Sequence, residues 1–321
     1  MRVLVTGSRG FVGSHIVKQL AGRGLKVLAF NRTPPQPADI DFLKPVIESV
    51  EFVTGDVTDA QTWNKVFSEY RIHGIIHSAA VNGEAQARKF PDLTMRTNVS
   101  GTLELLIAAN MARIKKFVYV GSGTQYGSRT DLTPLKETDN CSPRGLYPNA
   151  KQATEMMGIA YSKLAGVNFV SARISAPYGP LDRIDPAPTH IKFWCRAALD
   201  KTDVKLDTGG EHRRDFTYIE DSVKGIVALY LADHLSSTVY NISSGKSHSL
   251  SEVIAILKRL VPDANLQIAG GLMEVNHPQV ENSYRGPLDI SRAAIDVKFA
   301  PSYSLEEGIT EYVTWLRQHP F

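Results

Sequence analysis

The sequence contains few of the features that mark specialised protein classes. Its 321 residues include two cysteines, Cys141 and Cys195, which are far apart, so we expect neither a disulfide framework nor a structural zinc site. No apolar run approaches the roughly 20 residues of a membrane-spanning helix, so no membrane partner is expected. Met1-Arg2 leads directly into a strand-like segment, which predicts a cytoplasmic protein without a signal peptide.

An excess of one charge is also lacking. The 36 Lys and Arg residues nearly balance the 33 Asp and Glu residues, and the basic residues are scattered, which argues against nucleic acid as a partner. A net charge of +3 fits a basic pocket for a small anion better. No clustered carboxylates suggest a catalytic metal, and no Gly-x-Ser-x-Gly motif surrounds Ser122.

Short β-branched runs alternate with longer amphipathic stretches in the first two-thirds of the chain. Strands are predicted at 3–5, 27–30, 50–53, 75–77, 117–120 and 169–174, and helices at 11–20, 60–70, 97–112 and 150–164. Repetition of strand, helix, strand predicts a parallel sheet. The expected fold is therefore α/β, a Rossmann-type doubly wound sheet.

The sequence pattern changes near residue 177, where prolines interrupt any periodicity. We predict a dinucleotide-binding domain over 1–176, to which some later segments return, and a mainly substrate-binding, smaller mixed α/β region over 177–321. In the second region, helices are predicted at 189–199, 222–232, 250–260 and 305–317, and a strand at 239–242. This region is expected to fold over the carboxyl edge of the sheet, where open α/β sheets bind ligands.

A glycine-rich loop directly follows the first predicted strand and opens the first helix. It reads Thr6-Gly7-Ser8-Arg9-Gly10-Phe11-Val12-Gly13. Gly7 permits a tight turn, Gly10 lets the backbone approach a pyrophosphate, and Gly13 permits close packing of helix on strand. Phe11 and Val12 supply backbone N–H groups at the helix start. The loop predicts a dinucleotide site, although a merely tight turn is the alternative.

The end of the second strand indicates which dinucleotide binds. An acidic residue there would bind both ribose hydroxyls, but this chain has Asn31 and Arg32, which suit a 2′-phosphate, and Arg9 could reach the same group. We therefore predict NADP, with NAD still open if Arg32 is only a solvated loop residue. Asp56, in Gly55-Asp56-Val57, could place a carboxylate under the adenine amino group or could be a turn residue.

Three residues form a candidate hydride-transfer site. Tyr147 and Lys151 are four apart in a helical pattern and so share one face. A phenol with a pKa near 10 is a poor base at neutral pH, and a nearby ammonium or cationic nicotinamide should lower that pKa. Ser122, at the end of the fifth strand, could hydrogen-bond the reacting oxygen.

These motifs together resemble the extended short-chain dehydrogenases, in particular the nucleotide-sugar epimerase and dehydratase group. The resemblance runs nearly end to end and rests on the glycine loop, His77-Ser78-Ala79-Ala80, Asn98-Val99-Ser100-Gly101-Thr102, Ser122 to Gly127, Tyr147 to Lys151, Tyr178-Gly179-Pro180 and Arg214-Asp215-Phe216. Ser122 precedes Tyr147 by 25 positions, the interval found in UDP-galactose 4-epimerases. Asn31, Arg32 and Arg9 look more like the NADP-using GDP-fucose synthases.

The resemblance implies roles for individual residues. Tyr147 acts as acid or base, Lys151 lowers its pKa and holds the nicotinamide ribose, and Ser122 with Thr124 holds the sugar oxygen. Further cofactor contacts are implied for Val57, Ala79, Ala80 and Asn98, and further substrate contacts for Gln125, Tyr178, Arg214 and Arg285. Arg214 also makes chemical sense as a diphosphate clamp, because a guanidinium binds phosphate oxygens bidentately. Its alternative role is as a structural partner of Asp215 or Asp221.

Departures from the family pattern narrow the reaction. Dehydratases place Asp-Glu after the catalytic hydroxyl, and decarboxylating members also have a Glu there, whereas this chain has Gly123-Thr124. Ala176 replaces the usual Asn before the Tyr178 motif, so one usual diphosphate contact is missing.

We predict an NAD(P)-dependent nucleotide-sugar epimerase that acts at C4 by transient oxidation to a keto sugar and re-reduction. The alternatives are an NADPH-dependent keto-sugar reductase, a non-catalytic NADP-binding sensor or scaffold, and a dehydrogenase for a non-nucleotide alcohol. The substrate partner is a nucleotide-diphosphate sugar. The resemblance also implies a homodimer formed through the helices at 97–112 and 150–164.

Overall fold

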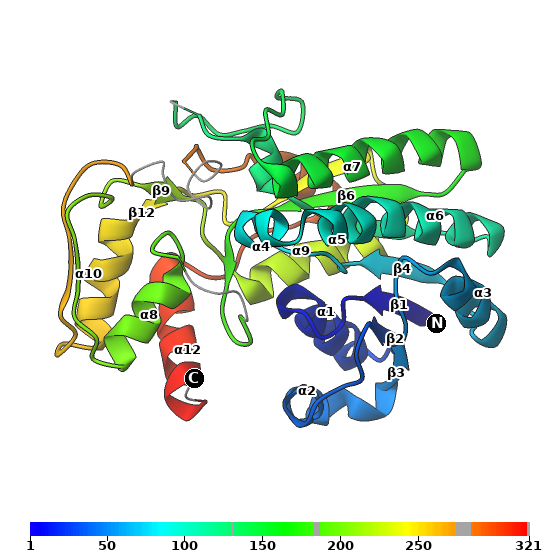
Figure 1. The fold of residues 1–321 in the computed structure, drawn as a ribbon, viewed down its shortest axis with the longest axis horizontal. Helices are drawn as coiled ribbons and strands as arrows, with labels where there is room; N and C mark the ends of the chain where they lie inside the picture. The colour runs from blue at the N-terminus through cyan, green and yellow to red at the C-terminus, as the bar shows by residue number, and fades with distance from the viewer. Residues whose placement is uncertain (130, 183–186, 274–283, 320–321) are drawn as a thin grey trace.

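Seven parallel strands form one sheet with helices on both faces (Figure 1). The computed structural model describes residues 1–129, 131–182, 187–273 and 284–319. The strands of the sheet are β1 (Arg2–Thr6), β2 (Lys26–Asn31), β3 (Val50–Thr54), β4 (Gly74–His77), β5 (Phe117–Ser122), β6 (Phe169–Ile174) and β11 (Val239–Ile242). Their spatial order is β11-β6-β5-β4-β1-β2-β3, and it reverses direction between β1 and β4. The predicted Rossmann-type α/β fold is confirmed.

The central strands of the sheet are buried on both faces, which explains why they are mostly apolar, whereas the edge strand β3 has no buried residue. In β1, Val3 and Val5 join one core cluster, and Leu4 between them joins another. Helices α1 (Phe11–Gly22) and α9 (Ile219–Leu231) cover the first face. Helices α3 (Ala60–Glu69), α6 (Gly101–Met111) and α7 (Leu146–Ala165) cover the second.

A smaller region packs beside the sheet and contains α8 (Ile191–Leu199), α10 (Leu250–Leu260) and α12 (Leu305–Gln318), at the left of Figure 1. Its two-stranded sheets pair β13 (Leu266–Ile268) with β8 (Val204–Leu206) and β12 (His248–Ser249) with β9 (Arg213–Arg214). A third pair, β7 (Pro177–Tyr178) with β10 (Thr217–Tyr218), lies where the chain leaves the large sheet. Apolar residues of this region belong to the same core cluster as the first sheet face, so the two parts share a core.

The remaining elements are short. They are α2 (Pro37–Leu43), α4 (Glu84–Lys89), α5 (Pro91–Met95), α11 (Ser291–Val297), two 3-10 segments at Lys44–Ser49 and Gly123–Tyr126, and a π-helical turn at Arg96–Ser100. The predicted helix at 97–112 therefore begins with this π-helical turn and continues as α6. Among the described residues, no helix has the length and apolar character needed to cross a bilayer.

Two elements from the second half of the chain lie with the large sheet. Strand β11 pairs with β6, and α9 packs against α1. These are among the later segments that return to the first region. The division of the chain at residues 176 and 177 stays a prediction.

Helix α7 is fixed tightly against β6, and this fixes the side chains at its start. Arg173 of β6 forms a buried ion pair with Glu155 of α7 at 2.5 Å, and Ser171 donates a hydrogen bond to the same carboxylate at 2.6 Å. Gly158 lets the helix approach, because a Cβ added there would lie 2.3 Å from the Phe169 ring. The close approach of α7 to the sheet thus depends on a residue without a side chain.

Substitution of Gly158 should therefore destabilise the protein, although alanine is ordinarily the better helix former. We expect Gly158→Ala to lower the free energy of unfolding by about 1–3 kcal/mol through overpacking. Gly22→Ala is the matched control: a Cβ at this last residue of α1 would meet Val46 at an ordinary 3.8 Å, so stability should hold or rise by up to about 1 kcal/mol. Urea denaturation of the three proteins measures the difference, and equal effects of the two substitutions would contradict the packing argument.

Candidate active site

Two cavities lie at the carboxyl edge of the large sheet, on either side of the glycine loop. The first is lined by the residues after β5, the start of α7 and residues of the smaller region. The second is lined by the residues after β2, β3 and β4. Gly10, Ser78 and Ala80 line both cavities, so the two are adjacent where β1 and β4 end. This is the switch point at which doubly wound sheets bind ligands.

The glycine loop adopts the geometry that its sequence predicts. Gly7 has φ +66°, and a Cβ added there would lie 2.7 Å from the backbone of Ala79. A Cβ at Gly13 would lie 2.1 Å from the Gly7 carbonyl oxygen, so helix α1 can pack this closely only with glycine. Gly10, at the N-cap, together with Phe11 and Val12 lines the first cavity. The first turn of α1 therefore faces the space where a pyrophosphate would lie.

The second cavity contains the residues predicted to choose the cofactor. Asn31 and Arg32 both line it, and Arg32 is exposed. Arg9 is already engaged, because its Nε donates to the buried carboxylate of Asp39 at 2.5 Å and its Nη1 donates to the Thr33 hydroxyl. Arg32 is thus the better-placed guanidinium for a 2′-phosphate, and Arg9 is held by an ion pair that the sequence analysis missed.

Some of the other predicted cofactor residues line the second cavity, whereas Asn98 only supports a loop beside it. Val57, Ala79 and Ala80 line the second cavity, as does Asp56, whose carboxylate also closes a turn by accepting from Thr58 N at 2.9 Å and its hydroxyl at 2.8 Å. Asn98 is buried and lines neither cavity. Its amide accepts from Val81 N at 2.7 Å and donates to Val81 O at 3.0 Å, so it fixes the loop after β4.

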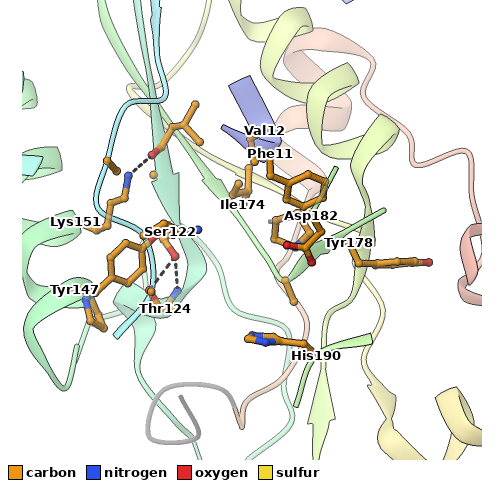
Figure 2. A pocket seen from close by; sticks show the side chains of 18 of the residues that line it. Phe11, Val12, Ser122, Thr124, Tyr147, Lys151, Ile174, Tyr178, Asp182 and His190 are labelled. Atoms are coloured by element: carbon orange, nitrogen blue, oxygen red, sulfur yellow. Dashed lines mark hydrogen bonds between the residues drawn. The ribbon is translucent and has the colours of Figure 1, made fainter. Parts of the chain in front are cut away.

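The three candidate catalytic residues meet in the first cavity (Figure 2). Ser122 Oγ lies 2.8 Å from Thr124 Oγ1 and accepts from Thr124 N at 3.2 Å. Lys151 Nζ donates to the Val120 carbonyl at 2.8 Å and lies 6.0 Å from the centroid of the Tyr147 ring. Strand β5 and helix α7 thus bring a hydroxyl, a phenol and an amine to one point.

Burial dominates the electrostatics of this cluster. It lowers the pKa of Lys151 to about 7 and raises the pKa of Tyr147 to about 12, although a side-chain hydrogen bond with Ser122 acts to lower the latter. The expected lowering of the phenol pKa by Lys151 is not seen in the chain by itself, because burial is the largest influence and raises that pKa. A phenol of high pKa holds its proton at neutral pH.

Two arginines of the smaller region face the same cavity. Arg214 is 8% exposed and Arg285 is 3% exposed, and both line the cavity. Burial, first, and their mutual repulsion lower the pKa of Arg214 to about 9; burial also lowers that of Arg285 to about 10. Arg214 Nη1 donates to the Thr189 carbonyl at 2.9 Å, but its buried Nε has no hydrogen-bond partner. Two buried cations that line one cavity suit an anion with more than one negative charge.

The alternative role of Arg214 as a structural partner is not supported. Asp215 accepts hydrogen bonds from Ser243, Ser244 and the backbone of Leu288, and Asp221 accepts from the backbone of Ser302 and Tyr303. Within the described part of the chain, neither carboxylate forms an ion pair with Arg214.

Two predicted substrate residues lie differently from expectation. Gln125 is fully buried and lines neither cavity; its amide accepts from Ser122 N at 3.0 Å and donates to Gln152 at 2.9 Å. It supports the Ser122 turn, and the prediction of direct substrate contact is corrected. Tyr178 lines the first cavity, but its hydroxyl donates to the Leu305 carbonyl at 3.4 Å and points away from Ser122 (Figure 2).

Sequence reasoning missed four polar residues of the first cavity, one of which is Asn82. Glu84, Asp182 and His190 all line it, and Figure 2 shows Asp182 and His190 opposite the Ser122 cluster. No sequence motif singled out Glu84, at the start of α4, or Asp182.

The described residues include no group of three or more potential metal ligands. His73 and His77 have the spacing of a helical metal-binding pair, which the sequence analysis overlooked, but His77 lies in strand β4. Its ring is buried between the hydroxyls of Thr6 at 2.7 Å and Thr102 at 2.9 Å, and burial lowers its pKa to about 3. It is a structural residue.

Comparisons with known proteins agree with this geometry. A family model described as the NAD dependent epimerase/dehydratase family matches residues 3–243. The chain is 26% identical over 323 residues to a UDP-glucuronate 4-epimerase of Thermodesulfobacterium geofontis, covering 98% of this chain and 96% of that protein. It is 27% identical over 340 residues to UDP-glucuronate 4-epimerase 3 of Arabidopsis thaliana, covering 98% and 76%. Its fold is similar to that of the UDP-glucose 4-epimerase of Thermus thermophilus in complex with NAD, with TM-score 0.84, 27% identity and coverage of 99% and 100%.

The lowered pKa of Lys151 gives a stability signature. Because burial lowers this pKa from 10.5 to about 7, the folded protein binds fewer protons than the unfolded chain between these values. The penalty of burying the ammonium is therefore present at low pH and is relieved as the pH rises through 7. Relative to Lys151→Met, the native protein should gain about 1 kcal/mol of unfolding free energy per pH unit between about pH 7.5 and 9.

Urea denaturation at several pH values measures this gain. Lys163→Met, a substitution at an exposed position of the same helix, is the control. A constant difference between the native protein and Lys151→Met across this range would show that burial does not shift Lys151.

Proposed function

Because the chain belongs to the NAD dependent epimerase/dehydratase family, and so is an enzyme of the extended short-chain dehydrogenase type, we propose that it is a nucleotide-sugar 4-epimerase. One observation carries the proposal: Ser122, Tyr147 and Lys151 share a cavity with the buried pair Arg214 and Arg285. Proton-exchanging residues and a pair of buried cations in one cavity match the sugar and the diphosphate of a sugar nucleotide. A substrate without a diphosphate would offer no anionic group to these two guanidinium groups.

The residues have distinct roles in the proposed reaction. A nicotinamide dinucleotide, when bound, supplies the acceptor and donor of the hydride. With a cationic nicotinamide bound, the pKa of Tyr147 would fall, and the phenol would then accept the proton of the sugar hydroxyl and return it. Ser122 with Thr124 would orient that oxygen. Lys151 places a proton donor beside the phenol. Its ammonium lies near the Tyr119 and Tyr147 rings and donates a hydrogen bond to the Val120 carbonyl. Arg214 and Arg285 hold the diphosphate, which leaves the sugar free to present either face.

The protein residues around the glycine loop fit the dinucleotide. A Cβ at Gly7 would press on the backbone of Ala79, and a Cβ at Gly10 or Gly13 would press on the Gly7 carbonyl, so the three glycines keep the loop tight and leave the start of α1 open to a pyrophosphate. The adenosine half would occupy the cavity beside Asn31, Asp56 and Val57.

Several observations favour epimerisation over related reactions. Gly123 and Thr124 follow Ser122, so the acid and base that dehydratases carry at these positions are missing. Curated relatives that match nearly the whole of this chain are named UDP-glucuronate 4-epimerases. We therefore propose a UDP-hexose or UDP-hexuronate substrate. The competing keto-sugar reductase is favoured only by Arg32. This residue suits the 2′-phosphate of NADPH, the cofactor that net reductions consume.

We propose NADP as the preferred cofactor, with NAD accepted. Arg32 supports this preference, since it is exposed at the cavity beside Asn31, and neither position at this end of β2 holds an acidic residue. The Thermus thermophilus relative is in complex with NAD, which is why acceptance of NAD is part of the proposal.

We also propose a homodimer, and a cytoplasmic location stays a prediction. The helices α5, α6 and α7 expose a set of large apolar side chains: Leu93, Met95, Ile107, Met111, Met156 and Leu164. A face of this kind on adjacent helices suits burial against a second copy.

The proposed activity predicts interconversion of two C4-epimeric UDP-sugars with no net change in nicotinamide absorbance. Tyr147→Phe should lower kcat by at least about 100-fold, because it removes the proton-exchanging group. Tyr161→Phe, the same change later in α7 at a residue that lines neither cavity, should leave kcat unchanged. Net consumption of NADPH with a 4-keto sugar nucleotide, without interconversion, would instead establish the reductase.

The proposed cofactor preference predicts tighter binding of NADPH than of NADH. Arg32→Ala should weaken NADPH binding by about 10-fold or more, the loss of a charged hydrogen bond, and leave NADH within twofold. Arg23→Ala, at an exposed residue that lines neither cavity, is the control. Fluorescence titration measures both affinities, and equal binding of the two cofactors to the native protein would contradict the preference.

A further inference from the structure

The buried carboxylate of Glu84 lies against the first turn of α7, the helix that carries Tyr147 and Lys151. Its Oε1 accepts from Leu146 N at 3.1 Å, and its Oε2 accepts from Tyr147 N at 2.9 Å. Arg88 Nε also donates to Oε1 at 2.8 Å. Glu84 is 6% exposed and lines the same cavity as Ser122 and Tyr147. The contact is therefore with the backbone of the candidate catalytic residue itself.

The start of α7 has no cap of its own. Gly145 occupies the N-cap position and offers no side chain, while Pro148 has no N–H. The N–H groups of Leu146 and Tyr147 would be left unpaired in a buried place, which is costly. Glu84, from a different part of the chain, satisfies both. A negative charge at this end also suits the positive end of the helix dipole.

Gly145 makes this approach sterically possible. Its φ is +91°, and a Cβ added there would lie 2.4 Å from Glu84 Oε1. Only glycine therefore permits both this turn and the close carboxylate. The positive φ of Gly145 and the close approach of the Glu84 carboxylate therefore occur together and both require glycine at this position.

Glu84 also connects this helix to the cofactor side of the site. It follows the loop after β4, in which Ala79 and Ala80 line the second cavity. Asn98 fixes this loop through both backbone groups of Val81. The segment after β4 thus connects the cofactor cavity with the backbone of Tyr147.

We propose that Glu84 is a positioning residue that sets the Tyr147 phenol against Ser122 by holding the two N–H groups at the start of α7. This inference rests on the proposed function for its effect on turnover. Glu84 transfers no proton in this account. A glutamine at this position keeps the shape but offers only one acceptor oxygen, so one of the two N–H groups would face an amide donor.

The test compares Glu84→Gln with the native protein in three measurements. In hydrogen exchange, the amide of Leu146 or of Tyr147 should exchange about 10-fold faster in the variant, because one of these two N–H groups loses its acceptor. In epimerisation, kcat should fall about 10-fold while KM stays within twofold, because a small misplacement of a reacting group slows turnover. The pH profile of kcat should keep its shape.

Two control variants distinguish the loss of the N–H contacts of Glu84 from the loss of its ion pair and from a general effect on the fold. Arg88→Gln removes the ion pair but leaves both N–H contacts, and kcat should stay within about threefold of the native value. Glu69→Gln makes the same chemical change at the half-exposed end of α3 and should change nothing. Thermal unfolding identifies a variant that has lost its fold, and Glu84→Asp, which keeps a carboxylate, should then recover part of kcat.

The outcomes distinguish this inference from the proposed function. The positioning role would be overturned by unchanged exchange at both Leu146 and Tyr147 or by unchanged kcat in a folded Glu84→Gln. It would also be overturned by a raised KM with native kcat or by loss of one limb of the pH profile. If the native protein interconverts no sugar nucleotide, the proposed function fails. The exchange measurement still decides whether Glu84 holds the start of α7.

Discussion

The site depends on the close approach of backbone to backbone where β1 and β4 end. The turn at Gly7 lies against Ala79, and the first turn of α1 lies against the Gly7 carbonyl through Gly13, with no room for a Cβ at either glycine. This contact fixes the start of α1 at the point where the strand order reverses. The two cavities share this point. The packing of the glycine loop on the end of β4 therefore also makes the two parts of the site adjacent.

Buried positive charge is the second constraint on the site. Lys151, Arg214 and Arg285 are each nearly inaccessible to water, and burial lowers the pKa of each. Such groups are costly to bury unless a ligand offsets the lost hydration. A dinucleotide and a diphosphate-bearing substrate both bring negative charge to this place. The protein thus holds its cations in an environment that becomes favourable when anionic ligands bind.

The sequence predicted the parts of this arrangement that depend on local pattern. The glycine loop, the order of strands and helices, and the convergence of Ser122, Tyr147 and Lys151 follow from short motifs and from the rule that parallel strands end at one edge. It did not predict contacts between distant segments. Glu84 meets α7 across more than 60 residues, and Asp39 meets Arg9 across 30, and neither pair has a spacing that a motif could reveal. Gln125 was assigned to substrate because its motif lies at the site, but its amide turns inward.

The central claim is that the sugar loses and regains the hydrogen at C4 within one closed site. A UDP-hexose labelled with deuterium at C4 tests this claim directly when it is incubated in ordinary water with catalytic amounts of dinucleotide. The account predicts that the epimeric product retains the deuterium at C4. Exchange of the label for solvent hydrogen, or its accumulation in free dinucleotide without an epimeric product, would contradict the account.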